Sequence, residues 1–295
     1  MEDKLIIKYL ETTSRCNYDC PMCIEKTRNS DMLKKDFYSI VENNRDILSG
    51  QRVWLNFCGE PLMDEHIFER ISFLTSIGAV VQLTTNGFFL NDTNIINIIN
   101  SGIDYIVVSV PSLSDKIYKQ LCGVDNLHII LENVFKLKQY INNFKSQVQV
   151  QAVGVNIGTD FDKEKYINFF HERGIDAAVH QFTNRARHSR IDIPVEHIKI
   201  SKRSQCVGLK QNITILSNCD VVTCCCNLSG KNSLGNLRDF NYSMIDLIKS
   251  SKIDEFINKK NVYIYKDICK DCNDWIYYQK NSPEEYVELY ELSMK

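Results

Sequence analysis

The sequence has little of three features that mark common classes of protein. No uninterrupted apolar stretch approaches the ~20 residues that a membrane-spanning helix needs. Acidic residues number 37 and basic residues 35, so the net charge of −2 provides no basic surface for nucleic acid. The opening MEDKLIIK lacks the basic segment and the long apolar segment of a secretory signal. These absences predict a cytoplasmic protein with neither a membrane nor a nucleic-acid partner.

Cysteine, by contrast, is abundant, with 12 in 295 residues. Disulfides do not persist in a reducing cytoplasm, so the cysteines indicate metal or redox chemistry. Three lie in residues 16–23 and seven in the last third, with only Cys58 and Cys122 between them. This distribution predicts two separate metal sites.

Strand-like and helix-like segments alternate through the first 185 residues. Strands are expected at Leu5–Leu10, Val53–Phe57, Val80–Thr84, Tyr105–Val110, Gln147–Val155 and Ala177–Gln181. Helices are expected at Asp36–Leu48, Glu65–Ser76, Asn94–Asn100 and Lys163–Arg173, and where Ile130, Val134, Leu137 and Ile141 recur at helical spacing. Six strand–helix units indicate a parallel sheet with right-handed crossovers, two units short of a closed barrel. We therefore predict an α/β fold, a partial (β/α)6 barrel, over residues 1–190.

The alternation stops after the sixth strand. Residues 191–205 are predicted to be a linker and residues 206–295 a small cysteine-rich domain. That domain is expected to contain a hairpin turning at Ser217-Asn218, a helix over Ser243–Ile257 and a final helix from Pro283 to about Ser293. The basic residues from Arg187 to Arg203 are interpreted as a solvated face.

The first cysteine group is closely spaced, with Cys16, Cys20 and Cys23 on one loop directly after the first strand. Three thiolates leave one iron of a four-iron cluster without a protein ligand, which suits a cluster that does chemistry. The alternative is a zinc knuckle with a fourth ligand from elsewhere, although no histidine lies near the three cysteines.

This loop resembles the CxxxCxφC motif of the radical S-adenosylmethionine (SAM) superfamily. The resemblance continues at Cys58-Gly59-Glu60-Pro61 after the second strand and at Thr85-Asn86-Gly87 after the third. It implies that Cys16, Cys20 and Cys23 hold a 4Fe–4S cluster. It also implies SAM contacts from Met22, Gly59, Glu60, Pro61, Asn86, Ser109 and Gln151, the last of these in the fifth-strand region up to Asn156. The sequence departs from the pattern twice: Met22 replaces an aromatic residue, and Cys58 replaces the first glycine.

The C-terminal cysteines resemble the auxiliary-cluster extensions of this superfamily, the SPASM and shorter twitch domains. The resemblance implies a second 4Fe–4S cluster held by Cys206, Cys224, Cys269 and Cys272. Cys219 stands where the family usually has a turn glycine. Because adjacent residues on a strand point to opposite faces, Cys224 and Cys225 are not expected to ligate together. Cys225 is either a structural thiol or a hydrogen-atom donor of the kind radical epimerases use; a zinc ribbon is the alternative for the whole set.

The chain most resembles deoxy-scyllo-inosamine dehydrogenase-like enzymes, which implies an oxidoreductase. In such an enzyme a 5′-deoxyadenosyl radical abstracts hydrogen from an alcohol carbon of an aminocyclitol or sugar-like molecule, and the auxiliary cluster accepts an electron. Arg185 either contacts substrate and helps remove a proton or is a solvated linker residue. A flavodoxin- or ferredoxin-type protein is the expected electron donor. The alternatives are a radical epimerase that uses Cys225, radical modification of a ribosomally made peptide, and a zinc-binding scaffold without activity.

Overall fold

The computed structural model describes residues 6–23, 28–158, 161–183, 189–191, 193, 213–227, 229–231 and 233–250. Arg185, Cys206, Cys269, Cys272 and the final helix from Pro283 lie outside these residues, as do most of the predicted linker 191–205 and the end of the helix expected over Ser243–Ile257.

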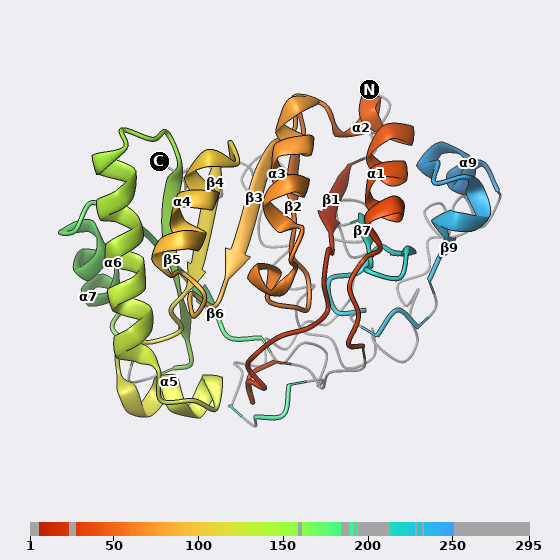
Figure 1. Ribbon diagram of the computed structural model, residues 1–295. Coiled ribbons are helices and arrows are strands. Elements are labelled where there is room, and N and C mark those ends of the chain that lie inside the picture. Colours follow the sequence, from red (N-terminus) through yellow and green to blue (C-terminus); the bar gives the residue numbers. More distant parts are fainter. Residues whose placement is uncertain are drawn as a thin grey trace.

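The described strands form one nine-stranded sheet in the order β6-β5-β4-β3-β2-β1-β7-β8-β9 (Figure 1). Adjacent strands from β1 to β6 pair in parallel, which confirms the predicted parallel sheet. These strands are β1 (Ile7–Leu10), β2 (Arg52–Trp54), β3 (Val80–Thr85), β4 (Tyr105–Ser109), β5 (Gln149–Asn156) and β6 (Asp176–Gln181).

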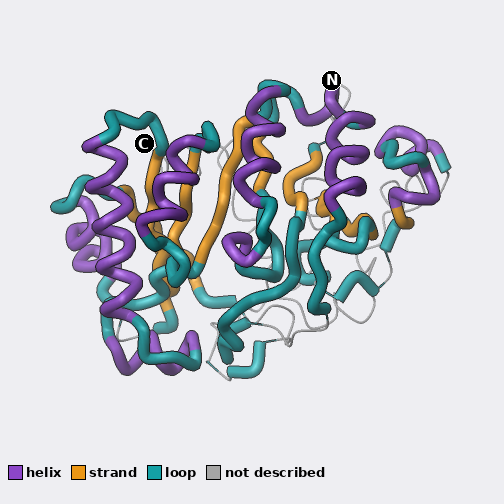
Figure 2. The backbone as a smooth tube through the Cα atoms, viewed as in Figure 1, coloured by secondary structure: helices purple, strands orange, loops and turns teal. Residues whose placement is uncertain are grey.

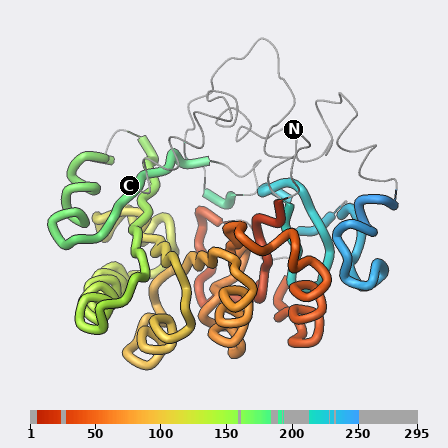
Figure 3. Tube along the Cα trace, turned by 90° about the horizontal axis from the view of Figure 1, so that it is seen from above, coloured from red at the N-terminus to blue at the C-terminus, as the bar shows by residue number. Residues whose placement is uncertain are grey.

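Helices follow the parallel strands and lie in an arc along one face of the sheet (Figure 3). Residues at helical spacing on α6 are buried, and its Ile130 faces β4 beside Val108. The helices are α1 (Lys34–Asn43), α2 (Arg45–Leu48), α3 (Ile67–Ser76), α4 (Asp92–Asn100), α5 (Asp115–Cys122), α6 (Leu127–Asn143) and α7 (Lys163–His171). Among the described residues, no helix is long and apolar enough to cross a membrane.

The expected single helix over Asp36–Leu48 is wrong, because the helix breaks at Asn44 into α1 and α2. The Asn44 side chain donates to the carbonyl oxygens of Ile40 and Tyr242, each at 2.7 Å. Its Oδ1 accepts from the backbone N–H of Met244 at 2.8 Å. Asn44 therefore binds a segment 200 residues away, and local periodicity carries no sign of that contact. Helix α5 was also missing from the sequence prediction.

The C-terminal third continues the same sheet. Strands β7 (Ile213–Ile215) and β8 (Asp220–Val222) form the predicted antiparallel hairpin around Ser217-Asn218, and β9 (Gly235–Asn236) pairs with β8. Strand β7 also pairs in parallel with β1. After the short helix η2 (Leu237–Phe240), helix α9 (Met244–Lys249) begins as predicted at Ser243, whose side chain accepts from the Asp246 N–H. The hairpin is thus joined to the parallel sheet by a strand pairing.

Candidate active site at the strand ends

The loops that follow β1, β2 and β3 gather at one end of the sheet, where the parallel strands finish (Figure 2). The loop after β1 carries Cys16, Cys20 and Cys23, and we call residues 14–23 the cysteine loop. At its start, Arg15 donates to Asp31 at 2.9 Å and to the Met63 carbonyl oxygen at 2.7 Å. The loop is therefore anchored directly beside its first cysteine.

The second half of the cysteine loop contacts the helical layer. The backbone N–H of Met22 donates to the Leu121 carbonyl oxygen at 3.1 Å, and the Cys23 N–H donates to the Cys20 carbonyl oxygen at 3.0 Å. The Met22 side chain packs partly buried against the core. In the described part of the chain, no three Cys, His, Asp or Glu side chains are grouped as metal ligands.

The third strand meets the cysteine loop through Asn86. Its Nδ2 lies 3.9 Å from the Cys16 sulfur and donates to Asn17 Oδ1 at 2.8 Å. Thus two residues assigned from separate motifs, a cluster ligand and a SAM contact, lie together. Three thiols of this kind, without a disulfide between them, fit the ligand set of a 4Fe–4S cluster.

Gly59 allows the segment after β2 to contact the cysteine loop closely. A Cβ at this position would lie 2.3 Å from the Thr13 carbonyl oxygen and 2.7 Å from that of Arg15. The next residue, Glu60, donates its backbone N–H to the same Arg15 oxygen at 2.7 Å. Glycine is required here by the approach of another backbone, while its dihedral angles are ordinary.

The Glu60 carboxylate points into the protein and holds the end of β3. It accepts hydrogen bonds from the Thr85 hydroxyl at 2.6 Å, the Asn86 N–H at 2.7 Å and the Leu62 N–H at 3.2 Å. Burial raises the pKa of Glu60 to about 7, and these three hydrogen bonds oppose the shift. The carboxylate therefore positions Asn86, and Pro61 follows as the buried first residue of a short helix, η1 (Pro61–Met63).

The fourth and fifth strands place their predicted residues at different levels. Ser109 is the last residue of β4 and is half-buried. Gln151 pairs with Val107, whereas Ser109 pairs with Val153. Gln151 therefore lies inside β5, two residues before the level of the β4 end. The end of β5, at Asn156, is the part of the predicted Gln151–Asn156 region that reaches this edge.

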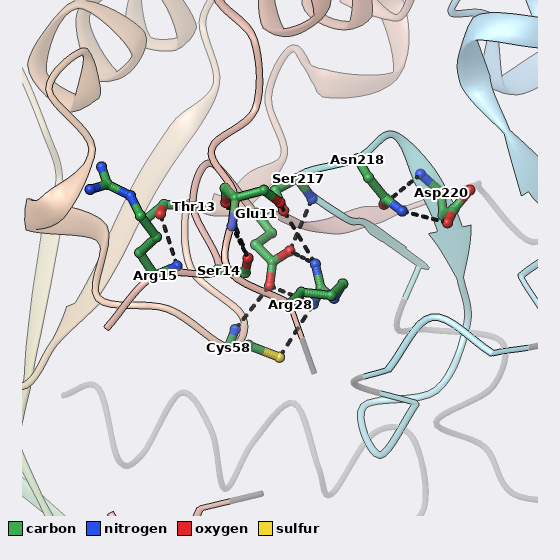
Figure 4. Close-up of polar contacts among 10 residues, drawn as sticks. Glu11, Thr13, Ser14, Arg15, Arg28, Cys58, Ser217, Asn218 and Asp220 are labelled. Atoms are coloured by element: carbon green, nitrogen blue, oxygen red, sulfur yellow. Dashed lines mark hydrogen bonds and ion pairs between the residues drawn. The ribbon is translucent and has the colours of Figure 1, made fainter. Parts of the chain in front are cut away.

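A buried carboxylate that the sequence interpretation missed joins four parts of this site (Figure 4). Glu11 directly follows β1, and its side chain is fully buried. It forms a two-pronged ion pair with Arg28 and accepts the backbone N–H groups of Cys58 at 3.2 Å and Ser217 at 2.9 Å. Arg28 also donates to the Cys58 sulfur at 3.5 Å and to the Ser217 hydroxyl at 3.2 Å. One acid thus connects β1, the residues after the cysteine loop, the segment after β2 and the hairpin turn.

The adjacent C-terminal cysteines are arranged differently from the prediction. Residues 224–226 lie in a turn after β8, so the alternation of a strand does not apply. The Cys224 thiol hydrogen-bonds with the thiols of Cys225 and Cys226, and the bond to Cys225 raises the pKa of Cys224. The premise that Cys224 and Cys225 lie on a strand is therefore wrong, and whether both ligate a cluster stays a prediction. Cys225 also lies within electrostatic range of the Lys8 ammonium group on β1.

Cys219 takes the conformation expected of the glycine that it replaces. Its φ is +71°, and its side chain is fully buried. The thiol hydrogen-bonds with Asp36 on α1, and burial raises the pKa of Cys219 to about 12. Asp36 also accepts from Arg238 at 2.5 Å and from the Tyr242 hydroxyl at 2.8 Å. These contacts give Cys219 a structural role.

One arginine from the supposed solvated face contacts the cysteine loop. Arg190 pairs with Asp19, with 2.8 Å between Nη2 and Oδ1. Arg190 is exposed, as the interpretation of Arg187 to Arg203 as a solvated face expects, but it also contacts the cysteine loop, which that interpretation did not include. An arginine in a polar linker has no local signal that separates these two situations.

Comparison with known proteins identifies the class to which this fold and site belong. The family model of the radical SAM superfamily matches residues 10–170, so the chain belongs to that superfamily. A second model, of the SPASM iron–sulfur cluster-binding domain, matches residues 206–273. These matches imply a 4Fe–4S cluster with SAM at the first site and auxiliary iron–sulfur binding by the C-terminal part.

Two relatives each match about half of the chain. An uncharacterized protein of Methanocaldococcus jannaschii is 28% identical over 52% of this chain and 51% of its own length. A probable GTP 3′,8-cyclase of Thermococcus kodakarensis is 27% identical over 53% and 51%. This chain spans about half the length of these relatives.

Two solved structures share the fold more completely. BtrN in complex with AdoMet and 2-DOIA aligns with a TM-score of 0.62 at 17% identity, covering 92% of this chain and 94% of BtrN. Streptococcus suis SuiB bound to the precursor peptide SuiA aligns with a TM-score of 0.63 at 17% identity, covering 84% and 67%. At these identities the similarity establishes the fold.

Proposed function

We propose that this chain oxidises an alcohol carbon of an aminocyclitol or sugar-like small molecule by radical SAM chemistry. The observation that carries the proposal is one sheet that bears a cysteine group after β1 and a second around β8, in a chain whose fold matches nearly all of BtrN. BtrN was solved with AdoMet and 2-DOIA, a small-molecule complex. The cysteine content favours a reducing cytoplasm as the site of action.

In this proposal Cys16, Cys20 and Cys23 hold the first cluster, and SAM lies along the strand ends. When bound, these groups supply a 5′-deoxyadenosyl radical that takes a hydrogen atom from the substrate carbon. The protein's contribution is placement. The close approach of Gly59 sets the segment after β2 against the cysteine loop, and the Glu60 carboxylate holds Asn86 beside Cys16. Met22, Pro61, Ser109 and the β5 region from Gln151 to Asn156 complete the proposed SAM surroundings.

The auxiliary cluster held by the second cysteine group is proposed to accept the electron that the substrate radical gives up when the ketone forms. Cys224 would share the auxiliary cluster with Cys206, Cys269 and Cys272. The turn that carries Cys224 and Cys225 follows the end of β8 opposite Ser217, roughly 10 Å along the strand. This separation supports a role beside the auxiliary cluster for Cys225 more than that of a hydrogen donor at the strand ends. Arg185 is kept as the proposed substrate-side residue, and a flavodoxin- or ferredoxin-type protein as the electron donor.

The first test measures iron and labile sulfide after anaerobic reconstitution of wild type and the Cys16/Cys20/Cys23→Ala variant. Two 4Fe–4S clusters predict about eight irons per chain, falling to about four in the variant. The second test incubates the loaded wild type with SAM, a reductant and a panel of aminocyclitols. We expect 5′-deoxyadenosine and a ketone in equal amounts. Zinc without iron, or SAM cleavage without any ketone across the panel, would overturn the proposal.

Radical modification of a ribosomally made peptide is a second candidate, because SuiB was solved with a precursor peptide. A peptide panel run beside the aminocyclitols distinguishes the two. Running both panels in D₂O separates oxidation from epimerisation, because an epimerase returns a hydrogen from a thiol that exchanges with solvent. If the enzyme is an epimerase, Cys225→Ala should stop turnover while SAM cleavage continues. If it is an oxidase, the same variant should still form the ketone.

A further inference from the structure

Arg190 makes a denser set of contacts with the cysteine loop than an ordinary surface arginine makes. Its guanidinium donates to both carboxylate oxygens of Asp19, from Nη1 at 2.9 Å and from Nη2 at 2.8 Å. Nη2 also donates to the carbonyl oxygens of Asp19 at 3.0 Å and Cys20 at 2.9 Å. The backbone N–H of Arg190 donates to the Pro21 carbonyl oxygen at 3.0 Å. A forked, charge-assisted contact of this kind fixes orientation as well as distance.

These contacts lie at the second cysteine of the loop, Cys20, and at the residues on either side of it, Asp19 and Pro21. Arg190 contacts the carbonyl oxygens of three consecutive residues, Asp19, Cys20 and Pro21. Arg15 anchors the loop before Cys16, the Met22 N–H donates to Leu121, and the Ser189 hydroxyl donates to the same Pro21 carbonyl oxygen at 3.4 Å. Arg190 therefore restrains the Asp19–Pro21 stretch around the second cysteine.

Arg190 also brings a positive charge to two of the three thiols. The guanidinium lies within electrostatic range of Cys20 and Cys23, in addition to its pairing with Asp19. The Arg190 side chain is 38% exposed and that of Asp19 65% exposed. Solvent screens part of the ion pair, so the contacts to backbone carbonyls matter more for holding the loop.

We propose that Arg190 is a positioning residue for the SAM-binding cluster, which holds the Asp19–Pro21 stretch in place and sets a positive charge beside Cys20 and Cys23. The chain after β6 thereby returns to complete the site that begins after β1. The proposal rests on superfamily membership and is independent of the substrate and of the reaction proposed above.

Different variants separate the two parts of this role, holding the loop and placing a positive charge near the thiols. Arg190→Ala removes both the fork and the charge. Arg190→Lys keeps the charge, but a single ammonium group cannot reproduce the fork. Asp19→Asn keeps an acceptor and removes the carboxylate charge. Arg45→Ala is the matched control, because Arg45 is a similarly exposed arginine that pairs with Glu42 at 3.0 Å, away from the loop.

The first measurement is hydrogen–deuterium exchange in the apoprotein, which needs neither iron nor substrate. Arg190→Ala and Arg190→Lys should each increase exchange of the Met22 and Cys23 amides about tenfold, because the loop opens more often. Arg45→Ala should leave this exchange unchanged, and Asp19→Asn should fall between. Equal exchange in wild type and both Arg190 variants would overturn the loop-holding role.

The second measurement is the reduction potential of the first cluster, by spectroscopic titration in a Cys224→Ala background. Reduction adds negative charge, and a nearby cation stabilises the reduced state. Arg190→Ala should therefore lower the reduction potential of the first cluster. At the midpoint potential of the Cys224→Ala protein, the Arg190→Ala variant should contain about threefold less reduced cluster. Arg190→Lys should return most of the reduced fraction, although its loop still exchanges fast. An unchanged potential in Arg190→Ala would overturn the electrostatic role.

Discussion

Cys219 occupies a backbone conformation that most side chains avoid. Its φ of +71° falls in the left-handed region, where a Cβ crowds the neighbouring carbonyl and glycine is favoured. The fully buried thiol and its hydrogen bond with Asp36 offset that strain. The family resemblance placed a turn glycine here, and the structure gives the reason for one.

We predict that Cys219→Gly is more stable than Cys219→Ala by about 1 kcal/mol. Both variants lose the thiol, so their difference isolates the left-handed backbone. Urea unfolding of the two apoproteins measures it. A Cys219→Ala chain that equals or exceeds Cys219→Gly would show that the turn tolerates a Cβ without cost.

Glu60 makes stability depend on pH in a direction opposite to that of most acids. Its pKa rises from 4.5 to about 7 on folding, so between these values the folded state binds a proton that the unfolded state has released. Stability contributed by Glu60 is therefore complete below about pH 4.5 and declines as the pH rises to about 7. The loss amounts to about 3 kcal/mol.

We predict that Glu60→Gln flattens this part of the pH profile. Wild type should lose more unfolding free energy than the variant between pH 5 and pH 8, measured by urea unfolding of the apoproteins. Glu65→Gln is the control, because the Glu65 side chain is 84% exposed. Parallel profiles for wild type and Glu60→Gln would contradict the assignment.

At the scale of elements, the Glu11–Arg28 ion pair fixes the relative positions of segments that pattern analysis treats separately. The Glu11 side chain is fully buried and that of Arg28 13% exposed. Removing one partner leaves the other charge buried without compensation, which costs about 3–5 kcal/mol.

We predict that Glu11→Gln and Arg28→Met each lower the unfolding free energy by about this amount, and that the double variant loses less than the sum of the two. Both should also raise the KM for SAM, since Cys58 and the segment after β2 lose their anchor. Lys119→Met, in an exposed pair with Asp125, should cost under about 1 kcal/mol. Additive effects of the two buried changes would show that the pair does not act as a unit.

Sequence patterns anticipated the parallel strands and most helices, because the burial that shapes them repeats locally. Ile130, Val134, Leu137 and Ile141 are all buried on α6, at the spacing that predicted it. The spacing of Cys16, Cys20 and Cys23 likewise predicted a common loop. The break at Asn44, the Glu11 contact with Ser217 and the Arg190 contact with Asp19 each involve a partner more than 150 residues away in sequence. No local pattern records such partners.

At the scale of the molecule, the cysteine-rich segment supports the core in two places. Strand β7 covers the edge of β1, and Arg238 and Tyr242 satisfy the buried Asp36 carboxylate on α1. The radical SAM region and the SPASM region are thus joined by backbone pairing and by buried polar contacts.

We predict that a chain ending at Gln205 will not fold as an independent core. Its β1 edge would be open to pairing with other chains, and Asp36 would be buried without its cation. Size-exclusion chromatography and thermal unfolding should find aggregation and a midpoint lower than that of the full chain. A monomer with an unchanged midpoint would show that the core stands alone.

The pairing of β1 with β7 also bears on how the protein is made. The partner of Ile7 is Ile213, so a ribosome working at about 5–20 residues per second completes β7 roughly 10–40 seconds after β1. Throughout that interval the nascent core presents an unpaired strand edge to the cell. The yield of soluble protein should therefore depend on whether the β1 edge is protected during translation. Chaperone binding should raise the yield, and slow synthesis at low temperature should change it by lengthening the interval. Both effects should exceed that of the stability of the finished fold.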